Sequence, residues 1–250
     1  MGTGVTNHFD LTGKTALITG GSRGLGLQMA LAFAEAGADI IVASRKLESC
    51  QTVAQQIIAM GRRALALSVH AGRWSEIDQL VERSYASFNQ IDILVNNAGM
   101  SPSMPSHEVT EELFDKVVSL NFKGPFRLAS LVAQRMAAGQ GGSIINISSG
   151  ASWKAMPRVV PYAGAKAALN AMTISLAQEY GPNVRVNAIA AGPFLTDISK
   201  AWSEEQRVSA PNAAARPGRP DEIVTSALFL ASPASSYVSG TVVRCDGALR

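Results

Sequence analysis

The sequence contains few charged residues, and this limits the partners that the protein can bind. Charged residues make up only 16% of the 250 residues, and 22 basic against 19 acidic side chains leave a net charge of +3. No basic run is present, so the charge pattern gives no support for a nucleic-acid partner. Because an average globular chain has about 25% charged residues, much of this surface must be neutral, which favours an oligomer.

Cysteine and long apolar runs are also scarce. Cys50 and Cys245 are the only cysteines, and His8, His70 and His107 are scattered along the chain, so we expect neither a disulfide framework nor a metal site. The apolar runs fall far short of the roughly 18 residues that a membrane helix needs. The first residues lack the apolar core of a signal peptide. We therefore expect a cytoplasmic protein that contacts no membrane.

What the chain has instead is a regular alternation of apolar strands with helices, and 47% of its residues are hydrophobic. Strands are predicted over residues 14–19, 39–44, 64–69, 91–96, 142–148, 184–190 and 241–244. Helices are predicted over residues 25–36, 48–60, 75–88, 110–120, 124–138, 161–180 and 221–231. Because the strands are apolar on both faces, the pattern predicts an α/β fold with a three-layer, doubly wound parallel sheet of about seven strands.

The whole chain, residues 1–250, fits a single domain of this type. No internal repeat or low-complexity linker divides it. The one long irregular segment spans residues 193–220, and we expect it to form a lid over the substrate.

A cluster of glycines lies between the first predicted strand and the first predicted helix. Residues 19–26 read Thr-Gly-Gly-Ser-Arg-Gly-Leu-Gly, a G-x-x-x-G-x-G spacing rather than the usual G-x-G-x-x-G. Glycines let the backbone approach a ligand closely, and a helix N-terminus offers N–H groups and a positive dipole end to a phosphate. This context predicts dinucleotide binding. The expected contacts are Gly20, Ser22, Arg23, Gly24, Leu25 and Gly26.

The second predicted strand ends in Ser44, Arg45 and Lys46, with no carboxylate among them. An NAD-binding site usually places a carboxylate there to hold the ribose hydroxyls. A guanidinium can instead pair with the 2′-phosphate of NADP, which a carboxylate would repel. Asp39 lies at the start of the same strand and so points away from the site. These residues predict NADP(H) as the cofactor.

Four residues are candidates for acid–base chemistry. Tyr162 and Lys166 stand four positions apart on one predicted helix and so share a face. Ser149 follows the fifth predicted strand, and Asn121 ends a predicted helix before that strand. In a doubly wound sheet the carboxyl ends of the strands form the ligand crevice. A free phenol has a pKa of about 10, which a neighbouring ammonium and a cationic nicotinamide would lower toward the working range.

Taken together, these residues resemble the short-chain dehydrogenase/reductase family of the single-domain type, from Leu11 to Arg250. The matching motifs are the glycine turn over residues 19–26, Asn96-Asn97-Ala98-Gly99, Asn121, Ser149 and Tyr162-Ala-Gly-Ala-Lys166. Ser149 precedes Tyr162 by thirteen positions, a spacing common in the family. The resemblance implies a Rossmann-type fold and an NADP-dependent oxidoreductase that interconverts a ketone and a secondary alcohol.

The resemblance also implies a role for each residue. Tyr162 would donate or accept a proton at the substrate oxygen, and Ser149 would hydrogen-bond to the same oxygen. Lys166 would lower the pKa of the phenol and hold the nicotinamide ribose, and Asn121 would position a water in a proton relay. The cofactor would further be contacted by Asn97, Ala98 and Gly99 beside its adenosine half, and by Thr196 at its carboxamide.

Two departures from the family pattern affect the cofactor site. The family often has an aspartate after the third strand that contacts the adenine amino group, but His70 and Ala71 stand here, so adenine would be held differently. The usual Pro-Gly after the sixth strand is replaced by Ala191-Gly192-Pro193, which changes the local backbone. The candidate cofactor contacts in these two regions are His70, Ala71, Gly192, Phe194 and Thr196.

The substrate class stays open. Residues 203–207 and 216–220 resemble the lid and its exit in 3-oxoacyl-thioester (acyl-carrier-protein) reductases, but many sugar and polyol dehydrogenases share such segments. A substrate with apolar surface is favoured by the apolar residues near the expected pocket. These residues are Met100, Met104, Trp153, Met156, Phe194 and Trp202. The alternative from another class is a non-catalytic NADP-binding sensor or scaffold, against which the complete Asn-Ser-Tyr-Lys set argues.

The predicted helices over residues 124–138 and 161–180 are expected to pair between subunits. In relatives the equivalent helices pair across a two-fold axis, and the C-terminal strand makes a second contact. We therefore expect a homotetramer, with a dimer as the alternative. Close approach of another helix would be allowed by the small residues Ala163, Ala165, Ala167, Ala168 and Ala171 of the second helix.

Overall fold

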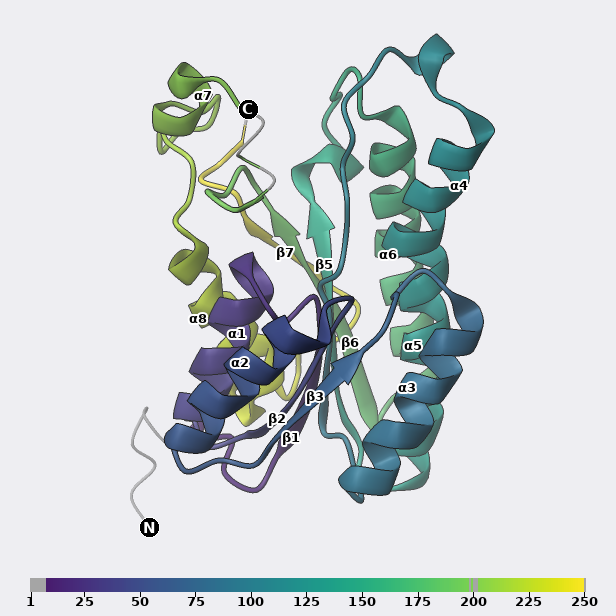
Figure 1. Cartoon of the computed structure of the whole chain (residues 1–250), viewed down its shortest axis with the longest axis vertical. Coiled ribbons are helices and arrows are strands. Elements are labelled where there is room, and N and C mark those ends of the chain that lie inside the picture. The colour runs from purple at the N-terminus through teal and green to yellow at the C-terminus, as the bar shows by residue number, and fades with distance from the viewer. Residues whose placement is uncertain (1–7, 198, 200–201, 250) are drawn as a thin grey trace.

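The computed structural model describes residues 8–197, 199 and 202–249, and within them a seven-stranded sheet forms the centre of the molecule (Figure 1). The strand order is β3-β2-β1-β4-β5-β6-β7, and every neighbouring pair is parallel, as predicted. The strands are β1 (Thr15–Thr19), β2 (Asp39–Ser44), β3 (Ala64–Ser68), β4 (Ile93–Asn96), β5 (Gly142–Ser149), β6 (Val184–Ala191) and β7 (Val242–Cys245).

Helices cover both faces of the sheet, which confirms the predicted three-layer arrangement. One face packs against α1 (Gly24–Glu35), α2 (Leu47–Ala59) and α8 (Val224–Ala231). The other face packs against α3 (Trp74–Ser87), α5 (Gly124–Ala138) and α6 (Val160–Tyr180). Two further helices, α4 (Glu111–Val118) and the short α7 (Glu204–Val208), lie near one end of the molecule in Figure 1.

Side chains alternate along each strand, so each strand contributes residues to the hydrophobic cores on both faces of the sheet. In β1, Ala16 and Ile18 belong to the core beneath α1 and α2, whereas Leu17 between them belongs to the core beneath α3 and α5. Successive side chains of a strand point to opposite faces, so a strand buried on both sides must be apolar throughout. This is why the strands could be recognised from short, continuous apolar runs.

The connection between α4 and α5 differs from the prediction. Two separate helices were expected, with Asn121 at the end of the first, but a π-helical turn (Ser119–Lys123) joins α4 directly to α5. The N–H of Gly124 donates to the carbonyl oxygen of Ser119, five residues back. A methyl group on Gly124 would lie 1.8 Å from the carbonyl oxygen of Ala71, so only glycine allows this close packing. The π turn was invisible to apolar periodicity because the apolar face continues through it.

The predicted helix over residues 221–231 also differs in detail. It begins as a 3₁₀ turn (Pro220–Ile223) and becomes α-helical only as α8. The other predicted helices and strands agree with the structure to within one or two residues at each end, an uncertainty that is usual for the ends of elements.

A buried chain of polar side chains fixes α6 on the sheet. The Asn96 amide of β4 donates to Asn146 Oδ1 of β5 at 2.9 Å. The Asn146 amide donates to Thr173 Oγ1 of α6 at 2.9 Å, and that hydroxyl donates to the carbonyl oxygen of Leu169. All three polar side chains are buried. Because an unpaired buried amide is costly, this chain allows one position of α6 along β5.

The segment over residues 193–220 is a loop whose two ends are joined. The N–H of Gly218 donates to the carbonyl oxygen of Pro193 at 2.8 Å, and the N–H of Leu195 donates to that of Gly218 at 2.9 Å. The segment was predicted to be irregular, but it contains α7, whose N-terminus is capped by Ser203 together with Gln206. None of the helices in the described residues is long and apolar enough to cross a membrane.

Candidate active site

The carboxyl ends of the parallel strands bring together most of the residues singled out from the sequence. Every strand runs in the same direction, so the segments that follow the strands lie at one edge of the sheet. These segments begin with the glycine turn after β1, Arg45 after β2, His70 after β3, Asn97 after β4, Gly150 after β5 and Gly192 after β6.

The glycine turn after β1 is held in shape by Asn97. The Asn97 amide donates to the carbonyl oxygens of Thr19 and Gly20, at 3.0 and 3.2 Å, and the N–H groups of Asn97 and Ala98 donate to the Thr19 hydroxyl. A methyl group on Gly26 would lie 2.3 Å from the Gly20 carbonyl oxygen. The side chain of Asn97 therefore fixes the turn, and its expected place beside the adenosine half of the cofactor stays a prediction.

The turn provides a cradle that fits a dinucleotide phosphate. Arg23, the residue before α1, has an extended backbone, and its side chain makes no capping hydrogen bond. Uncapped N–H groups at a helix N-terminus attract an anion, and Leu25 and Gly26 lie in this first turn. A methyl group on Gly24, whose φ is +54°, would lie 3.5 Å from the Thr196 side chain. Thr196 therefore lies against the same turn, as expected for a residue of the cofactor site.

Arg23 links the glycine turn to the segment after β6. Its guanidinium lies 2.9 Å from the Asp197 carboxylate, next to Thr196 in the chain. The Arg23 side chain is two-thirds exposed, so the ion pair is partly screened by water. The sequence predicts that Arg23 contacts the cofactor. In the structure its guanidinium also contacts Asp197 of the segment over residues 193–220.

The end of β2 lies beside the glycine turn. The Ser22 hydroxyl donates to the Ser44 hydroxyl at 3.0 Å. The Ser68 hydroxyl donates to the Arg45 carbonyl oxygen at 3.0 Å, which fixes the backbone of Arg45 while its side chain stays exposed. Lys46, also exposed, precedes α2. Ser44, Arg45 and Lys46 thus follow one another at the end of β2, beside the Ser22 hydroxyl of the glycine turn, and one hydroxyl with two cations is a donor set that suits a phosphate.

His70 and Ala71 lie in a tight turn after β3. The His70 Nδ1 atom accepts from the N–H of Gly72 at 3.3 Å, and the His70 N–H donates to the Glu76 carboxylate at 2.6 Å. Ala71 is buried against the start of α5. The imidazole therefore stabilises its own turn, and the ring is only half-buried.

Ser149, Tyr162 and Lys166 meet at the end of β5. Ser149 is the last residue of β5, and its hydroxyl accepts from the N–H of Ala151 at 3.2 Å and hydrogen-bonds with Tyr162. The Lys166 Nζ atom lies 5.7 Å from the centre of the Tyr162 ring. It donates to the carbonyl oxygen of Ile147 at 2.7 Å. The helix spacing predicted from the sequence thus places both side chains of α6 beside Ser149.

Burial shifts the pKa values of both ionisable groups away from their charged forms. Loss of water lowers the pKa of the Lys166 ammonium to about 7. Burial raises the pKa of the Tyr162 phenol, and the hydrogen bond with Ser149 opposes that rise without overcoming it. The sequence led us to expect that Lys166 would lower the pKa of the phenol. Without a bound cofactor, desolvation of the phenolate raises this pKa, and the lowering expected beside a cationic nicotinamide stays a prediction.

Asn121 is completely buried in the π turn, and its side chain clamps the segment after β4. Its amide donates to the carbonyl oxygens of Met100 and Val117, both at 2.9 Å. A methyl group on Gly99 would lie 2.8 Å from Asn121 Oδ1 and 3.7 Å from Lys166 Nζ. Gly99 therefore fills the narrow space between these two side chains.

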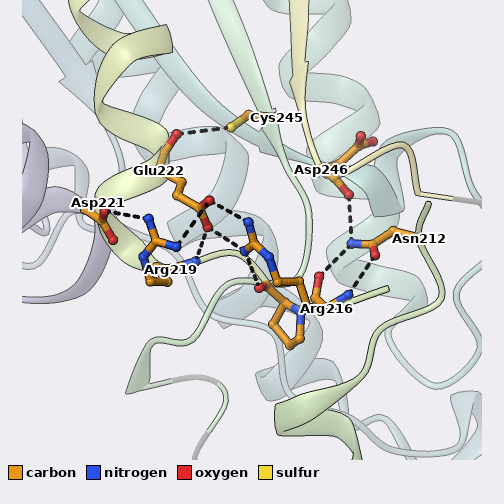
Figure 2. A network of polar contacts seen from close by, with 8 residues as sticks. Asn212, Arg216, Arg219, Asp221, Glu222, Cys245 and Asp246 are labelled. Carbon is orange, nitrogen blue, oxygen red and sulfur yellow. Dashed lines mark hydrogen bonds and ion pairs between the residues drawn. The ribbon is translucent and has the colours of Figure 1, made fainter. Parts of the chain in front are cut away.

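The C-terminal segment was missed by the sequence analysis and closes one side of the site. Leu249 is buried, and a methyl group on Gly150, the residue after Ser149, would lie 2.5 Å from its side chain. The Asn212 amide donates to the carbonyl oxygen of Asp246 at 3.2 Å, as Figure 2 shows, so the loop also holds this segment. No motif could reveal such contacts, because the chain brings Gly150 and Leu249 together only in the folded state.

The exit of the 193–220 loop is fixed by ion pairs (Figure 2). Two nitrogens of the Arg216 guanidinium donate to the two oxygens of Glu222, each at 2.7 Å. These bonds, with that from the Arg219 N–H, lower the pKa of Glu222 to about 2. At the loop entrance, Phe194 is buried against Gly218, and a methyl group on Gly192 would lie 2.6 Å from Asp246 Cα. Gly192 and Phe194 are thus packed within the protein at the base of the loop.

Comparison with known proteins agrees with this geometry. The family model described as short chain dehydrogenase matches residues 14–207. The chain belongs to this family. It is therefore an oxidoreductase of a family that binds a nicotinamide cofactor, as the sequence resemblance implied. The glycine turn, the Asn97 contacts and the Ser149–Tyr162–Lys166 group fit such a cofactor beside an acid–base group.

Relatives within the family have different names. The chain is 37% identical to an NAD-dependent glycerol dehydrogenase of Listeria innocua, over 98% of this chain and 96% of the relative. It is 39% identical to a 2-dehydro-3-deoxy-D-gluconate 5-dehydrogenase of Dickeya dadantii, over 97% and 98%. Among solved structures, a 3-oxoacyl (acyl-carrier-protein) reductase of Agrobacterium tumefaciens with NADP bound has a TM-score of 0.92, 32% identity and 98% coverage of both chains.

The packing of Gly99 leads to a prediction. Gly99→Ala should destabilise the protein by about 1–3 kcal/mol, because the new methyl group meets a buried amide that is already hydrogen-bonded. It should also weaken binding of the reduced nicotinamide cofactor, measured by nicotinamide fluorescence, since Lys166 lies on the other side of Gly99. The matched control is Gly164→Ala in α6, where nothing lies within 4 Å of the new methyl group. Equal urea midpoints for the two variants would contradict the prediction.

Proposed function

We propose that this protein is an NADP(H)-dependent oxidoreductase that interconverts a ketone and a secondary alcohol. The observation that supports it most directly is the meeting of the Tyr162 phenol, the Ser149 hydroxyl and the buried Lys166 ammonium. This group lies at the same sheet edge as the uncapped glycine turn. A proton donor beside a hydride carrier is what the interconversion requires.

In this proposal each residue acts at a defined atom. Tyr162 gives its proton to the carbonyl oxygen when the ketone is reduced, and takes it back when the alcohol is oxidised. Ser149 donates a hydrogen bond to the same oxygen. Lys166 holds the nicotinamide ribose, and its charge favours the phenolate of Tyr162. When bound, the nicotinamide supplies a hydride to the carbonyl carbon or accepts it in the reverse direction.

Asn121 and the loop complete the proposed site. Asn121 belongs to the proton relay that the family resemblance implies, and its side chain holds Met100 and Gly99 close to Lys166. The 193–220 loop acts as the lid. The hydrogen bonds that join its two ends and the Arg23–Asp197 ion pair support this role, because they place the described part of the loop beside the glycine turn.

Removal of the phenol hydroxyl tests the chemistry. Tyr162→Phe should lower turnover of a ketone panel with NADPH by at least about 100-fold, read at the nicotinamide absorbance. Folding and NADPH binding should survive, since only the hydroxyl is lost. Tyr237→Phe is the matched control, because the Tyr237 side chain is fully exposed. Turnover of Tyr162→Phe near that of the control would remove Tyr162 from the acid–base role, and no turnover by the unmodified protein would favour the sensor or scaffold alternative.

The preference for NADP(H) rests on Arg45. The relatives differ, since one is named NAD-dependent and another was solved with NADP bound, so the family alone does not decide. Here the end of β2 presents Ser44, Arg45 and Lys46, and the backbone of Arg45 is held by Ser68. The adenosine ribose of a cofactor seated on the glycine turn would lie beside these residues.

Affinity for the two reduced cofactors tests this preference. NADPH should bind at least about tenfold tighter than NADH, because one charge-assisted pair supplies about 1.5–3 kcal/mol. Arg45→Ala should remove most of that ratio, and Arg83→Ala, which removes an exposed arginine of α3, should leave it unchanged. Equal fluorescence titrations of the unmodified protein with NADPH and NADH would refute the preference.

Two substrate classes have support. A 3-oxoacyl thioester is supported by the apolar residues near Tyr162 and by the likeness to the 3-oxoacyl reductase. A sugar acid or polyol is supported by the relatives named for gluconate derivatives and glycerol. In both classes a carbonyl oxygen would accept from Tyr162 and Ser149. A cytoplasmic location is supported by the two cysteines, which are both free thiols.

We also propose that the protein is a homotetramer, with a dimer as the alternative. Ala171 and Ile174 of α6 are exposed, as is Phe126 of α5, although both helices bury their other face against the sheet. Exposed apolar side chains on two adjoining helices favour a helix–helix interface. At the other end of the molecule β7 forms an edge of the sheet, which supports a second contact.

A charge on the exposed face of α6 tests the assembly. Ala171→Glu should split the oligomer, because an unpaired charge in an interface is costly to bury. Ala171 is exposed and does not face the sheet, so the new carboxylate should not cause misfolding. Light scattering measures the mass, and Gln55→Glu on the exposed face of α2 is the control. A mass near 26.2 kDa for the unmodified protein at micromolar concentration would contradict both tetramer and dimer.

A further inference from the structure

The side of α6 that carries Tyr162 and Lys166 also carries Asn170. The three residues stand four positions apart in turn, so they follow one another along one side of the helix. Tyr162 and Lys166 have roles in the proposed chemistry, whereas Asn170 has none so far. Its amide donates to the Ser152 hydroxyl at 2.9 Å. Through this bond α6 contacts the short turn that follows β5.

Ser152 connects this contact to Ser149. The Ser152 hydroxyl donates to the carbonyl oxygen of Ser149 at 2.6 Å. A hydroxyl has one proton to donate, so this proton is bound to Ser149 while the Ser152 oxygen accepts from Asn170. Two consecutive hydrogen bonds thus join the Asn170 side chain to the backbone of Ser149.

This link reaches a part of the chain that lies beyond the end of the strand. Lys166 is bonded to the carbonyl oxygen of Ile147, two residues before Ser149, and so holds α6 on β5 itself. Ser149 is the last residue of β5, and a 3₁₀ turn (Gly150–Ser152) follows it. The bonds from Asn170 therefore fix the place at which the chain leaves the sheet, which is where the Ser149 hydroxyl lies.

The Asn170 side chain is retained although one of its polar atoms is unsatisfied. Its Oδ1 atom is buried and has no hydrogen-bond partner within the described residues. A buried oxygen without a partner reduces stability, and an apolar side chain would avoid that loss. A purely structural contact between α6 and the turn would thus be better made by an apolar residue, so the amide indicates a role in placing Ser152.

We propose that Asn170 and Ser152 are positioning residues that fix the Ser149 hydroxyl beside Tyr162. This inference rests on the proposed function and adds two residues that act through Ser149. The Ser149 Oγ atom accepts from the N–H of Ala151 at 3.2 Å, so a turn whose backbone is fixed also orients the hydroxyl. An N–H group can only donate, and the Ser149 proton is therefore available to the substrate oxygen.

A second support of the turn should keep variants of these residues folded. A methyl group on Gly150 would lie 2.5 Å from the Leu249 side chain, so the C-terminal segment packs directly on the turn. The Arg244 guanidinium donates to the carbonyl oxygen of Leu249 at 3.1 Å and lies 5.3 Å from the centre of the Trp153 ring. Loss of the Ser152 hydroxyl should therefore displace the turn slightly without unfolding it.

Removal of the Ser152 hydroxyl tests the proposal. Ser152→Ala should lower kcat for a ketone reduced with NADPH at least about tenfold, because a slightly displaced donor stabilises the reacting oxygen poorly. The KM for the ketone and the Kd for NADPH should change less than about twofold, since the lost stabilisation belongs to the transition state. Asn170→Ala should lower kcat by a smaller factor, of about threefold or more, because Ser152 keeps its bond to Ser149.

Ser143, at the other end of β5, provides the matched control. Its hydroxyl donates to the carbonyl oxygen of Leu230 at 2.7 Å, so Ser143→Ala removes the same kind of hydrogen bond. The urea midpoints of Ser143→Ala and Ser152→Ala should fall by similar amounts, whereas only Ser152→Ala should lower kcat. Equal kcat values for the two variants would overturn the proposal, because they would leave Ser152 with a structural role alone.

A double-mutant cycle measures whether Ser152 acts through Ser149. Ser149→Ala removes the hydroxyl that is positioned, so the further change Ser152→Ala should lower kcat by less than about twofold in that background. The same loss in both backgrounds would overturn the role of Ser152 while leaving the oxidoreductase activity intact. If no ketone is turned over in a Tyr162-dependent way, the proposed function fails, and this proposal fails with it.

Discussion

The position of α6 on β5 is the constraint on which the rest of the site depends. Lys166 reaches through the core to the carbonyl oxygen of Ile147, and one β5 residue earlier Asn146 reaches back to Thr173. A buried ammonium and a buried amide each need a specific partner, so the helix cannot slide along the strand without leaving a polar group unpaired. Tyr162 lies one turn before Lys166, and the same contacts therefore set its distance from Ser149.

A second set of contacts joins the glycine turn to the 193–220 loop and to the C-terminal segment. Asn97 holds the glycine turn, Arg23 in that turn pairs with Asp197, and Asn212 in the same loop holds the carbonyl oxygen of Asp246. The C-terminal segment then packs on Gly150, beside Ser149. The glycine turn, the loop and Ser149 are thus joined by a continuous series of contacts at the carboxyl edge of the sheet.

Chemistry and selectivity are built from different parts of the fold. The proposed acid–base residues lie at the end of β5 and on α6, where burial and regular hydrogen bonding make their positions firm. The segment over residues 153–159 lies between these two elements and is mostly exposed. This division predicts that relatives share one framework but differ in substrate, and the relatives compared above carry the names of different substrates.

Much of the fold followed from local patterns. Continuous apolar runs bounded by glycine predicted all seven strands, and the four-residue spacing of Tyr162 and Lys166 predicted a shared helix face. The π turn at Asn121 and the short α7 were missed, because neither changes the apolar periodicity. Burial raises the pKa of Tyr162 in the protein without a cofactor, and this contribution could not be predicted because the cost of burying the phenolate depends on its surroundings and not on its neighbours in sequence.

By itself, the sequence determined the α/β sandwich, the glycine cradle and the residues available for acid–base chemistry, because these depend on the properties of residues that are close together in the chain. Only the tertiary structure decided that Asn97 closes the glycine turn, that Leu249 packs on Gly150, and that Asn121 holds the segment after β4. Those contacts join residues from different elements. The packing of the helices on the sheet selects such contacts, and no local pattern encodes which distant residues that packing will bring together.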